Sequence, residues 1–401
     1  MTSVCHIAAK GIMGRSMNIN SLEVQDAFPP KPPRFIAFYL PQFYPTQYND
    51  EWWGKGFTEW TNVVTGRPHF KGHYQPHLPA DLGFYDLRVP ETREAQATMA
   101  REYGVHGFCY YHYWFGGKRI LERPLDEVLD SGSPDLPFCV CWANEAWTRA
   151  WNGHQDKVLM PQSYSPEDDL AHIRHLLPIF SDKRYITIDE KPLLLVYRIE
   201  LLPNPHATAD LWRREAENCG LPGLFLVSIE SNYVIGNTSP SAVGFDAAVR
   251  FQPNFTAPPT ASGMRALALK KVKDLYPGLH RGIKQIRPQP RVKDNIYNYA
   301  DLFSSWRNSP LHPERHFDCV TPMWDNSGRR HRGATIVRDS TPELYEQWLR
   351  EAVARSGPDS SQQRTVFINA WNEWAEGCHL EPCRRWGLKY LEATRRVYDA
   401  G

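Results

Sequence analysis

The stretch TVFINAWNEWAEG (residues 365–377) joins a run of apolar residues directly to a polar segment with two glutamates. The run is too short for a helix and apolar on both faces, which is typical of a buried parallel strand. Seven further runs share these properties: FIAFYL (35–40), VHGFCYYHY (105–113), PFCVCWA (137–143), KPLLLVY (191–197), LFLVSI (224–229), FDAAVRF (245–251) and FDCVTPMW (317–324). The sequence therefore predicts eight buried parallel strands.

Helical patterns lie between several of these runs. They cover residues 89–104, 165–180, 209–220, 340–357 and 386–400. The second of them opens with Ser165, Pro166 and acidic residues, as the first turn of a helix should. Strands that alternate with helices predict an α/β fold, a (β/α)8 TIM barrel in a single catalytic domain. The alternative is a doubly wound open sheet, but no glycine-rich phosphate turn follows the first run.

Two segments fall outside this alternation. Residues 1–33, which end in FPPKPP, are predicted to be a flexible lead-in to a barrel that spans residues 34–400. Residues 257–300 contain LKKVKDLYPGLHRGIKQIRPQPRVK, a clearly basic insert between the sixth and seventh strands. A solvated surface excursion is the simpler interpretation of this insert, and a lid or a docking patch for an acidic partner is the other.

Composition excludes several classes of protein. The formal net charge of +1 over 401 residues indicates no global field for nucleic acid or a membrane surface. The eight cysteines lack zinc-site spacing and are interpreted as reduced thiols. The N-terminal residues contain no apolar core of signal-peptide length, and no stretch approaches the ~20 apolar residues of a membrane helix. The sequence thus predicts a cytoplasmic protein with no nucleic-acid partner, no transmembrane segment, no metal and no other cofactor.

Polar and aromatic residues follow most of the predicted strands at their carboxyl ends. Because the active site of a (β/α)8 barrel lies at this end, we expect these residues to surround its mouth. The predicted substrate-binding residues are Gln42, Trp60, His112, Trp114, Asn144, Glu145, Trp147, Trp324, Trp371, Asn372 and Trp374. Two of these predictions have a competing interpretation: His112 as a core histidine, and Trp60, with Glu59, as a brace for a loop.

The chemistry is predicted to centre on Glu373 and Glu376. Carboxylates among tryptophans suit sugar substrates, since aromatic rings pack against the apolar face of a pyranose and carboxylates bond its hydroxyl groups. Glycosidic cleavage needs one proton-donating carboxyl and one carboxylate. At helical i,i+3 spacing the two Cβ atoms would lie about 5–6 Å apart. Two glutamates on one loop approach the sugar from a similar side, whereas a conventional pair straddles the bond.

Glu145 is the alternative catalytic residue. The stretch WANEAW repeats the order of apolar residue, asparagine and glutamate after the third predicted strand. A pair formed by Glu145 with Glu373 or Glu376 would straddle the bond. The competing interpretation of Glu145 is a structural partner of Arg149.

Five motifs together resemble the WbsX-like family, which is similar to glycoside hydrolase family 99, the endo-α-mannosidases. They are FYLPQFYPTQYNDEWWGKGFTEWTNV, QPHLPADLGFYDL, GFCYYHYWFGGKRILERPLDEVL, CWANEAWTRAWNG and INAWNEWAEGCHLEP, and the resemblance covers roughly residues 34–395. It implies a (β/α)8 barrel that acts on α-linked glycosides with retention. It also implies that Glu373 deprotonates the sugar 2-hydroxyl to give a 1,2-anhydro intermediate, while Glu376 is acid and then base. Such a base need not straddle the bond.

The resemblance leaves the direction of the reaction open. WbsX-like proteins are associated with bacterial surface polysaccharide clusters, such as those for O-antigen or capsule, and are often called glycosyltransferases. An Asp-x-Asp motif, usual in metal-dependent nucleotide-sugar transferases, is absent from the chain. The expected partner is an oligosaccharide or glycan substrate. Hydrolysis of its α-glycosidic bond is the first hypothesis, glycosyl transfer the second, and glycan binding without turnover the third.

Overall fold

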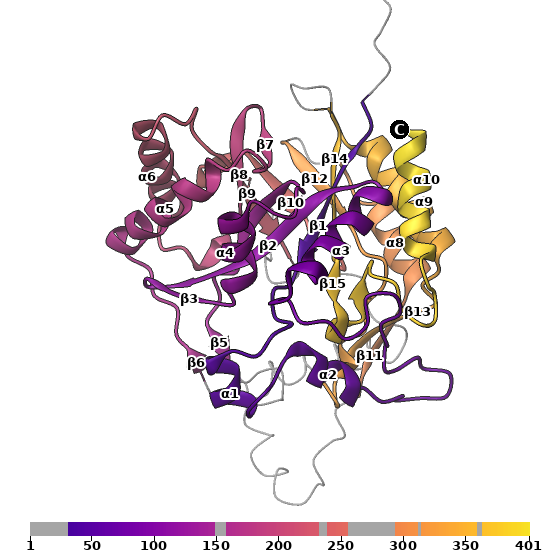
Figure 1. Cartoon of the computed structure of the whole chain (residues 1–401). Helices are drawn as coiled ribbons and strands as arrows, with labels where there is room; N and C mark the ends of the chain where they lie inside the picture. Colours follow the sequence, from indigo (N-terminus) through magenta and orange to yellow (C-terminus); the bar gives the residue numbers. More distant parts are fainter. Residues whose placement is uncertain (1–30, 149–157, 232–238, 256–292, 312–313, 359–362) are drawn as a thin grey trace, which may run out of the picture. The chain divides into compact units, whose positions relative to one another are not determined.

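The computed structural model describes residues 31–148, 158–231, 239–255, 293–311, 314–358 and 363–401. Eight parallel strands form its centre (Figure 1): β1 (Arg34–Tyr39), β2 (Val105–Phe115), β4 (Phe138–Trp142), β8 (Lys191–Val196), β9 (Phe225–Glu230), β10 (Ala247–Arg250), β12 (His316–Val320) and β14 (Thr365–Ile368). Each strand pairs with the next one along the chain, and β1 pairs with both β2 and β14. The sheet is therefore closed, and the predicted (β/α)8 barrel is confirmed.

Helices cover the outside of the barrel. They are α3 (Pro90–Glu102), α4 (Arg123–Ser131), α5 (Pro166–Phe180), α6 (Pro205–Asn218), α8 (Tyr299–Arg307), α9 (Pro342–Arg355) and α10 (Lys389–Ala400). Figure 1 shows α5 and α6 on one side of the strands and α8, α9 and α10 on the other. The five predicted helices are confirmed. The helix α5 begins as expected, because the Ser165 side chain accepts a hydrogen bond from the Asp168 backbone N–H.

The core consists of the barrel interior and the layer between strands and helices. Trp142 on β4, Trp212 on α6 and Trp348 on α9 are among its largest fully buried side chains. Trp348 packs against Tyr299 and Phe303 of α8, with ring centroids 5.5 and 5.6 Å apart. Aromatic rings therefore also pack between neighbouring outer helices.

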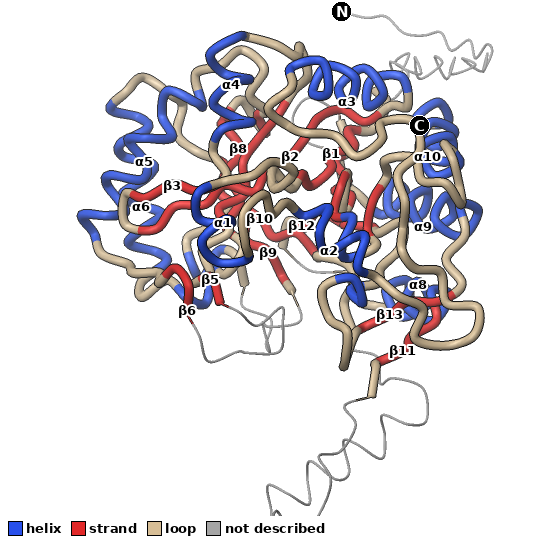
Figure 2. Tube along the Cα trace, turned by 60° about the horizontal axis from the view of Figure 1, so that its bottom comes forward, coloured by secondary structure: helices blue, strands red, loops and turns tan. Residues whose placement is uncertain are grey.

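Short elements surround the carboxyl ends of the strands. They are the helices α1 (Gln47–Trp53) and α2 (Glu59–Thr65), the strand pairs β5 (Trp147–Thr148) with β6 (Val158–Met160), β11 (Asn295–Asn298) with β13 (Thr335–Arg338) and β15 (Asn372–Glu373) with β16 (Cys378–His379), and the 3-10 turns η4 (Asn326–Gly328) and η5 (Trp374–Glu376). Figure 2, turned so that this end comes forward, shows α1 and α2 in front of the barrel strands. Any site at the mouth is built on these short elements and the strand ends.

The remaining elements are minor. The strand β3 (Lys118–Ile120) pairs with β2, β7 (Thr187–Ile188) pairs with β8, and η2 (Ile199–Leu201) and η3 (Ser241–Val243) are single 3-10 turns. None of the helices in the described ranges is both long and apolar enough to span a bilayer. Of the two segments outside the predicted alternation, residues 1–30 and 256–292 lie outside the described residues. Residues 295–300 form β11 and the start of α8. The lead-in and the basic insert stay predictions.

Candidate active site

A cavity of about 520 Å³ lies at the carboxyl ends of the barrel strands. This volume is in the range of sites that hold small ligands. Its lining includes Trp53, Tyr111, Tyr113, Glu145, Trp147, Tyr197, Arg198, Phe251, Trp324, Arg329, Arg330, Glu373 and Glu376. Aromatic rings therefore form much of the wall, and the charged groups are gathered among them.

One buried arginine holds three carboxylates together. In Arg329, Nη1 lies 2.6 Å from Oε1 of Glu376, and Nη2 lies 3.0 Å from Oε2 of Glu373. Its Nε lies 2.6 Å from Oε1 of Glu59. The Arg329 side chain is only 6% exposed, so these contacts lie in a water-poor environment in which charges interact strongly. The guanidinium fixes Glu373 and Glu376 relative to each other on one side of the cavity.

The two glutamates occupy unequal environments. The side chain of Glu373 is 9% exposed and that of Glu376 is 22% exposed. Burial raises the pKa of Glu373 to about 8, opposed by the Arg329 charge and reinforced by Glu376 and Glu59. Burial also raises the pKa of Glu59. Three carboxylates against one guanidinium give an excess of negative charge, so a bound proton near neutral pH is favoured in this cluster.

The local backbone of NEWAEG differs from the predicted helical spacing. Asn372 and Glu373 form β15, and residues 374–376 form the single 3-10 turn η5. Gly377 ends the turn with a φ of 55°, in the left-handed region that favours glycine. A Cβ at this glycine would lie 3.0 Å from the Asp325 side chain. The tight packing lets the Asp325 N–H donate to the Glu376 carbonyl at 2.6 Å, which anchors the turn.

The two asparagines that precede Glu373 and Glu145 brace neighbouring strands instead of lining the cavity. The side chain of Asn372 accepts from the Leu40 N–H at 2.7 Å and donates to the Leu40 carbonyl at 3.1 Å. Asn144 makes the same pair of bonds with the backbone of Arg198, at 2.7 and 2.8 Å. Each asparagine ties its loop to the end of an adjacent barrel strand. The prediction that these asparagine side chains surround the mouth is therefore corrected: they hold the loops that carry the glutamates.

Glu145 does line the cavity, but from another side. It follows β4, which is three strands around the barrel from β14. Its side chain is 40% exposed and forms an ion pair with Arg198. The partner expected from the sequence, Arg149, lies outside the described residues. The geometry keeps Glu145 within the same cavity as the Arg329 cluster.

His112 and Trp114 point away from the cavity, because side chains alternate along β2. Tyr111 and Tyr113 line the cavity instead. The Nε2 atom of His112 lies 3.1 Å from that of His172 on α5, and burial lowers the pKa of His112 to about 3. The Trp114 indole N–H donates to Asp168 at 2.9 Å. The prediction that these two residues surround the mouth is corrected, and His112 is a core histidine.

Four more predicted residues are buried outside the lining. The Trp60 indole donates to the Tyr85 carbonyl at 2.8 Å, and that of Trp374 donates to Glu381 at 2.6 Å. Trp371 packs against Phe108, with ring centroids 4.9 Å apart. Gln42 is fully buried, and its carbonyl accepts from the Glu59 N–H at 3.1 Å. These side chains support the site from behind, whereas Trp147 and Trp324 line the cavity as predicted.

Sequence reasoning missed Arg329, Tyr111, Tyr113 and Tyr197 as lining residues. The two tyrosines on β2 had a usable signal, because one of the two faces of that strand had to point inward. Arg329 had no such signal in the sequence, because a single arginine in a loop is usually exposed to solvent. For Glu59 the sequence allowed either sugar binding or a supporting role in its loop. Its ion pair with Arg329 favours the supporting role.

The sequence family described as Glycosyltransferase WbsX matches residues 35–394. The chain belongs to the WbsX family. Two curated relatives, both described as uncharacterized protein WxcX and from strains B100 and ATCC 33913 of Xanthomonas campestris pv. campestris, are 42% identical over 367 residues. The match covers 91% of this chain and 50% of theirs, so the chain spans about half the length of the curated relatives it matches.

Solved structures share the barrel. A family 99 endo-α-mannosidase from Bacteroides thetaiotaomicron superposes with a TM-score of 0.54 at 14% identity, over 92% of this chain and 96% of that one. A glycoside hydrolase-like protein superposes with a TM-score of 0.55 at 12% identity, over 94% and 97%. At such identities the likeness shows the fold alone. This WbsX-family chain therefore has a barrel like that of family 99.

Proposed function

We propose that this protein cleaves an α-linked glycosidic bond of a glycan with retention, and that Glu373 and Glu376 are its catalytic pair. The observation that supports this most is the Arg329 cluster, where two carboxyl groups of unequal exposure border an aromatic cavity. Unequal environments let one carboxyl act as base while the other acts as acid. The walls formed by Trp53, Trp147 and Trp324 are suited to pack against pyranose rings.

The proposed reaction uses one face of the sugar. Glu373 takes the proton of the 2-hydroxyl, whose oxygen attacks C1 as Glu376 gives its proton to the departing oxygen. Water then attacks C1 of the 1,2-anhydro sugar, Glu376 takes the water proton, and Glu373 returns its proton to O2. Two inversions at C1 give net retention. A pair that one guanidinium holds together fits this route, because neither group has to straddle the bond.

The family name favours a second candidate, glycosyl transfer. An acceptor hydroxyl that replaces water in the second step converts hydrolysis into transfer without any change in the pair. The resemblance to WbsX-like proteins supports a place in bacterial surface polysaccharide metabolism for either reaction. Binding without turnover is the third candidate, and an assay separates all three.

The deciding assay follows defined α-linked oligosaccharides, α-mannosides among them, by proton NMR, with and without nucleotide sugars. We expect release of a sugar whose first-formed anomer is α, because two inversions restore the starting configuration. A first-formed β anomer would contradict the retaining route. Product that forms only with a nucleotide-sugar donor would establish a transferase, and binding without product would establish a glycan-binding barrel.

The pH dependence of kcat/KM tests the role of Glu373. A base must be ionised, and the pKa of Glu373 is raised to about 8. We therefore expect kcat/KM to rise by up to about tenfold per pH unit as the pH approaches 8 from below. If Glu373 were the proton donor instead, kcat/KM would fall above pH 8. Glu145→Gln serves as the control, and this variant should keep the same rising limb.

A further inference from the structure

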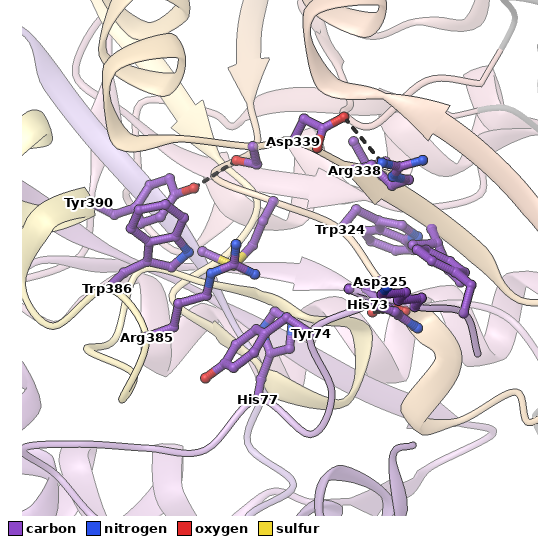
Figure 3. A pocket seen from close by; sticks show the side chains of 17 residues that line it. His73, Tyr74, His77, Trp324, Asp325, Arg338, Asp339, Arg385, Trp386 and Tyr390 are labelled. Carbon is purple, nitrogen blue, oxygen red and sulfur yellow. Dashed lines mark hydrogen bonds and ion pairs between the residues drawn. The ribbon is translucent and has the colours of Figure 1, made fainter. Parts of the chain in front are cut away.

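A second cavity of about 160 Å³ lies beside the first and has no part in the proposed reaction. Figure 3 shows its walls, with Arg385 and Trp386 on one side, Trp324 and Arg338 on the other, and Tyr74 below. An apolar cavity of about 150 Å³ accommodates benzene, so this volume suits one six-membered ring and not an oligosaccharide. The cavity is therefore a candidate site for one monosaccharide unit.

The two cavities are neighbours. Trp324 lines both of them, and the Asp325 N–H that follows it donates to the Glu376 carbonyl at 2.6 Å. A chain of sugars that passes Trp324 would place one unit near Glu376 and another in the second cavity. What the second cavity binds would thus help to select the substrate of the first.

The second cavity presents an exposed cation that is stacked on two aromatic rings. The guanidinium of Arg385 lies over the rings of Tyr74 and Trp386, 4.9 and 5.0 Å from their centroids. Ring stacking leaves the N–H groups at the edge of a guanidinium available, and their fork matches a carboxylate. Within the part of the chain that the structure describes, Arg385 forms no ion pair. In Figure 3 its side chain reaches toward the centre of the cavity.

The carboxylates of the cavity already have partners. Asp325 accepts from Gln75 at 2.7 Å and lies 2.6 Å from Nε2 of His73. Asp339 accepts from Asn298 at 3.0 Å and has a guanidinium nitrogen of Arg338 at 3.9 Å. Lys71 adds a further cation to the lining. The charge left to meet a ligand is positive and is framed by aromatic rings.

We propose that this second cavity binds a sugar unit that carries a carboxylate, a uronic acid, with Arg385 as the carboxylate ligand and the rings of Tyr74 and Trp386 beside it. This assignment rests on the proposed function, because the bound sugar unit would belong to the same glycan that is cleaved in the first cavity. It specifies the chemical class of that substrate as an acidic glycan.

Calorimetric titration of the whole protein with methyl α-D-glucuronide, methyl α-D-glucoside and inorganic phosphate tests the site without turnover. We expect the glucuronide to bind. The neutral glucoside should bind at least about tenfold more weakly, because it lacks the charge-assisted hydrogen bonds to Arg385. Phosphate should also bind at least about tenfold more weakly, because it has no pyranose ring to pack against Tyr74 and Trp386. Arg385→Gln should weaken glucuronide binding about tenfold or more. Arg384→Gln, the exposed neighbour outside both linings, should leave it unchanged.

The assignment would be overturned by equal affinity for glucuronide and glucoside, or by glucuronide binding that Arg385→Gln does not change. Phosphate binding as tight as that of the glucuronide would reduce the cavity to a simple anion site and would overturn it as well. The measurement is independent of the proposed function. If the protein binds the glucuronide through Arg385 but shows no turnover, this inference stands and the proposed function fails. If it shows turnover but does not bind the glucuronide, only the proposed function stands.

Discussion

Glu376→Gln is expected to lower turnover of an unactivated α-glycoside by about a thousandfold, because loss of a positioned acid or base typically costs 10²–10⁴-fold. The reason is that the departing alkoxide then leaves without a proton. A substrate with an activated aryl leaving group needs no such proton. On that substrate the first step of the Glu376→Gln variant should be nearly as fast as that of the unsubstituted protein, as measured by the rate of aryl-group release.

Glu373→Gln should show the opposite pattern. It removes the group that takes the proton of the 2-hydroxyl, so its loss of about a thousandfold should persist on activated and unactivated substrates alike. Both substitutions keep the hydrogen-bonding shape of the side chain beside Arg329. Activity that survives both would contradict the assigned pair and would move the test to Glu145, which faces the same cavity.

Arg329→Met is expected to destabilise the fold by about 3–5 kcal/mol, the usual cost when one partner of a buried ion pair is removed. The substitution leaves the fully buried Glu59 and the nearly buried Glu373 without a compensating charge. Chemical denaturation at pH 7 measures the loss. Because protonation relieves uncompensated carboxylates, we expect a smaller loss at pH 5.

The neighbouring Arg330 is the matched control. It also lines the cavity, but no ion pair is found for it among the described residues. Arg330→Met should therefore change stability by less than about 1 kcal/mol. Adding Glu59→Gln to Arg329→Met should recover part of the loss, as expected for residues in direct contact. A loss for Arg329→Met no larger than that for Arg330→Met would contradict the proposed role of the cluster.

The strands were predictable because a strand buried on both faces leaves an unambiguous apolar run. All eight runs became barrel strands, and the rule for the active end of a barrel then placed Glu373, Glu376, Glu145, Trp147 and Trp324 at one cavity. The same rule failed for His112 and Trp114. The reason is that β2 continues to Phe115, so both residues still lie within the strand and its alternation turns their side chains outward.

The supporting contacts were not predictable from local sequence. Asn144 and Asn372 lie at strand ends, as sugar-binding residues would, yet their partners are the backbones of Arg198 and Leu40. These contacts join residues 54 and 332 positions apart in the chain. Arg329 likewise contacts Glu59, 270 positions away. Strand pairing and loop packing in the folded barrel bring such groups together, and no pattern within one segment encodes these contacts.

The paired bonds of Asn144 and Asn372 have a consequence for how this scaffold can change. They attach the glutamate-bearing turns to the ends of barrel strands, and not to the longer connections around the mouth. Trp53 and Trp147, by contrast, lie on α1 and on β5, which pairs with β6. A change in those elements would alter the aromatic wall of the cavity, and the glutamates would keep their attachment to the barrel.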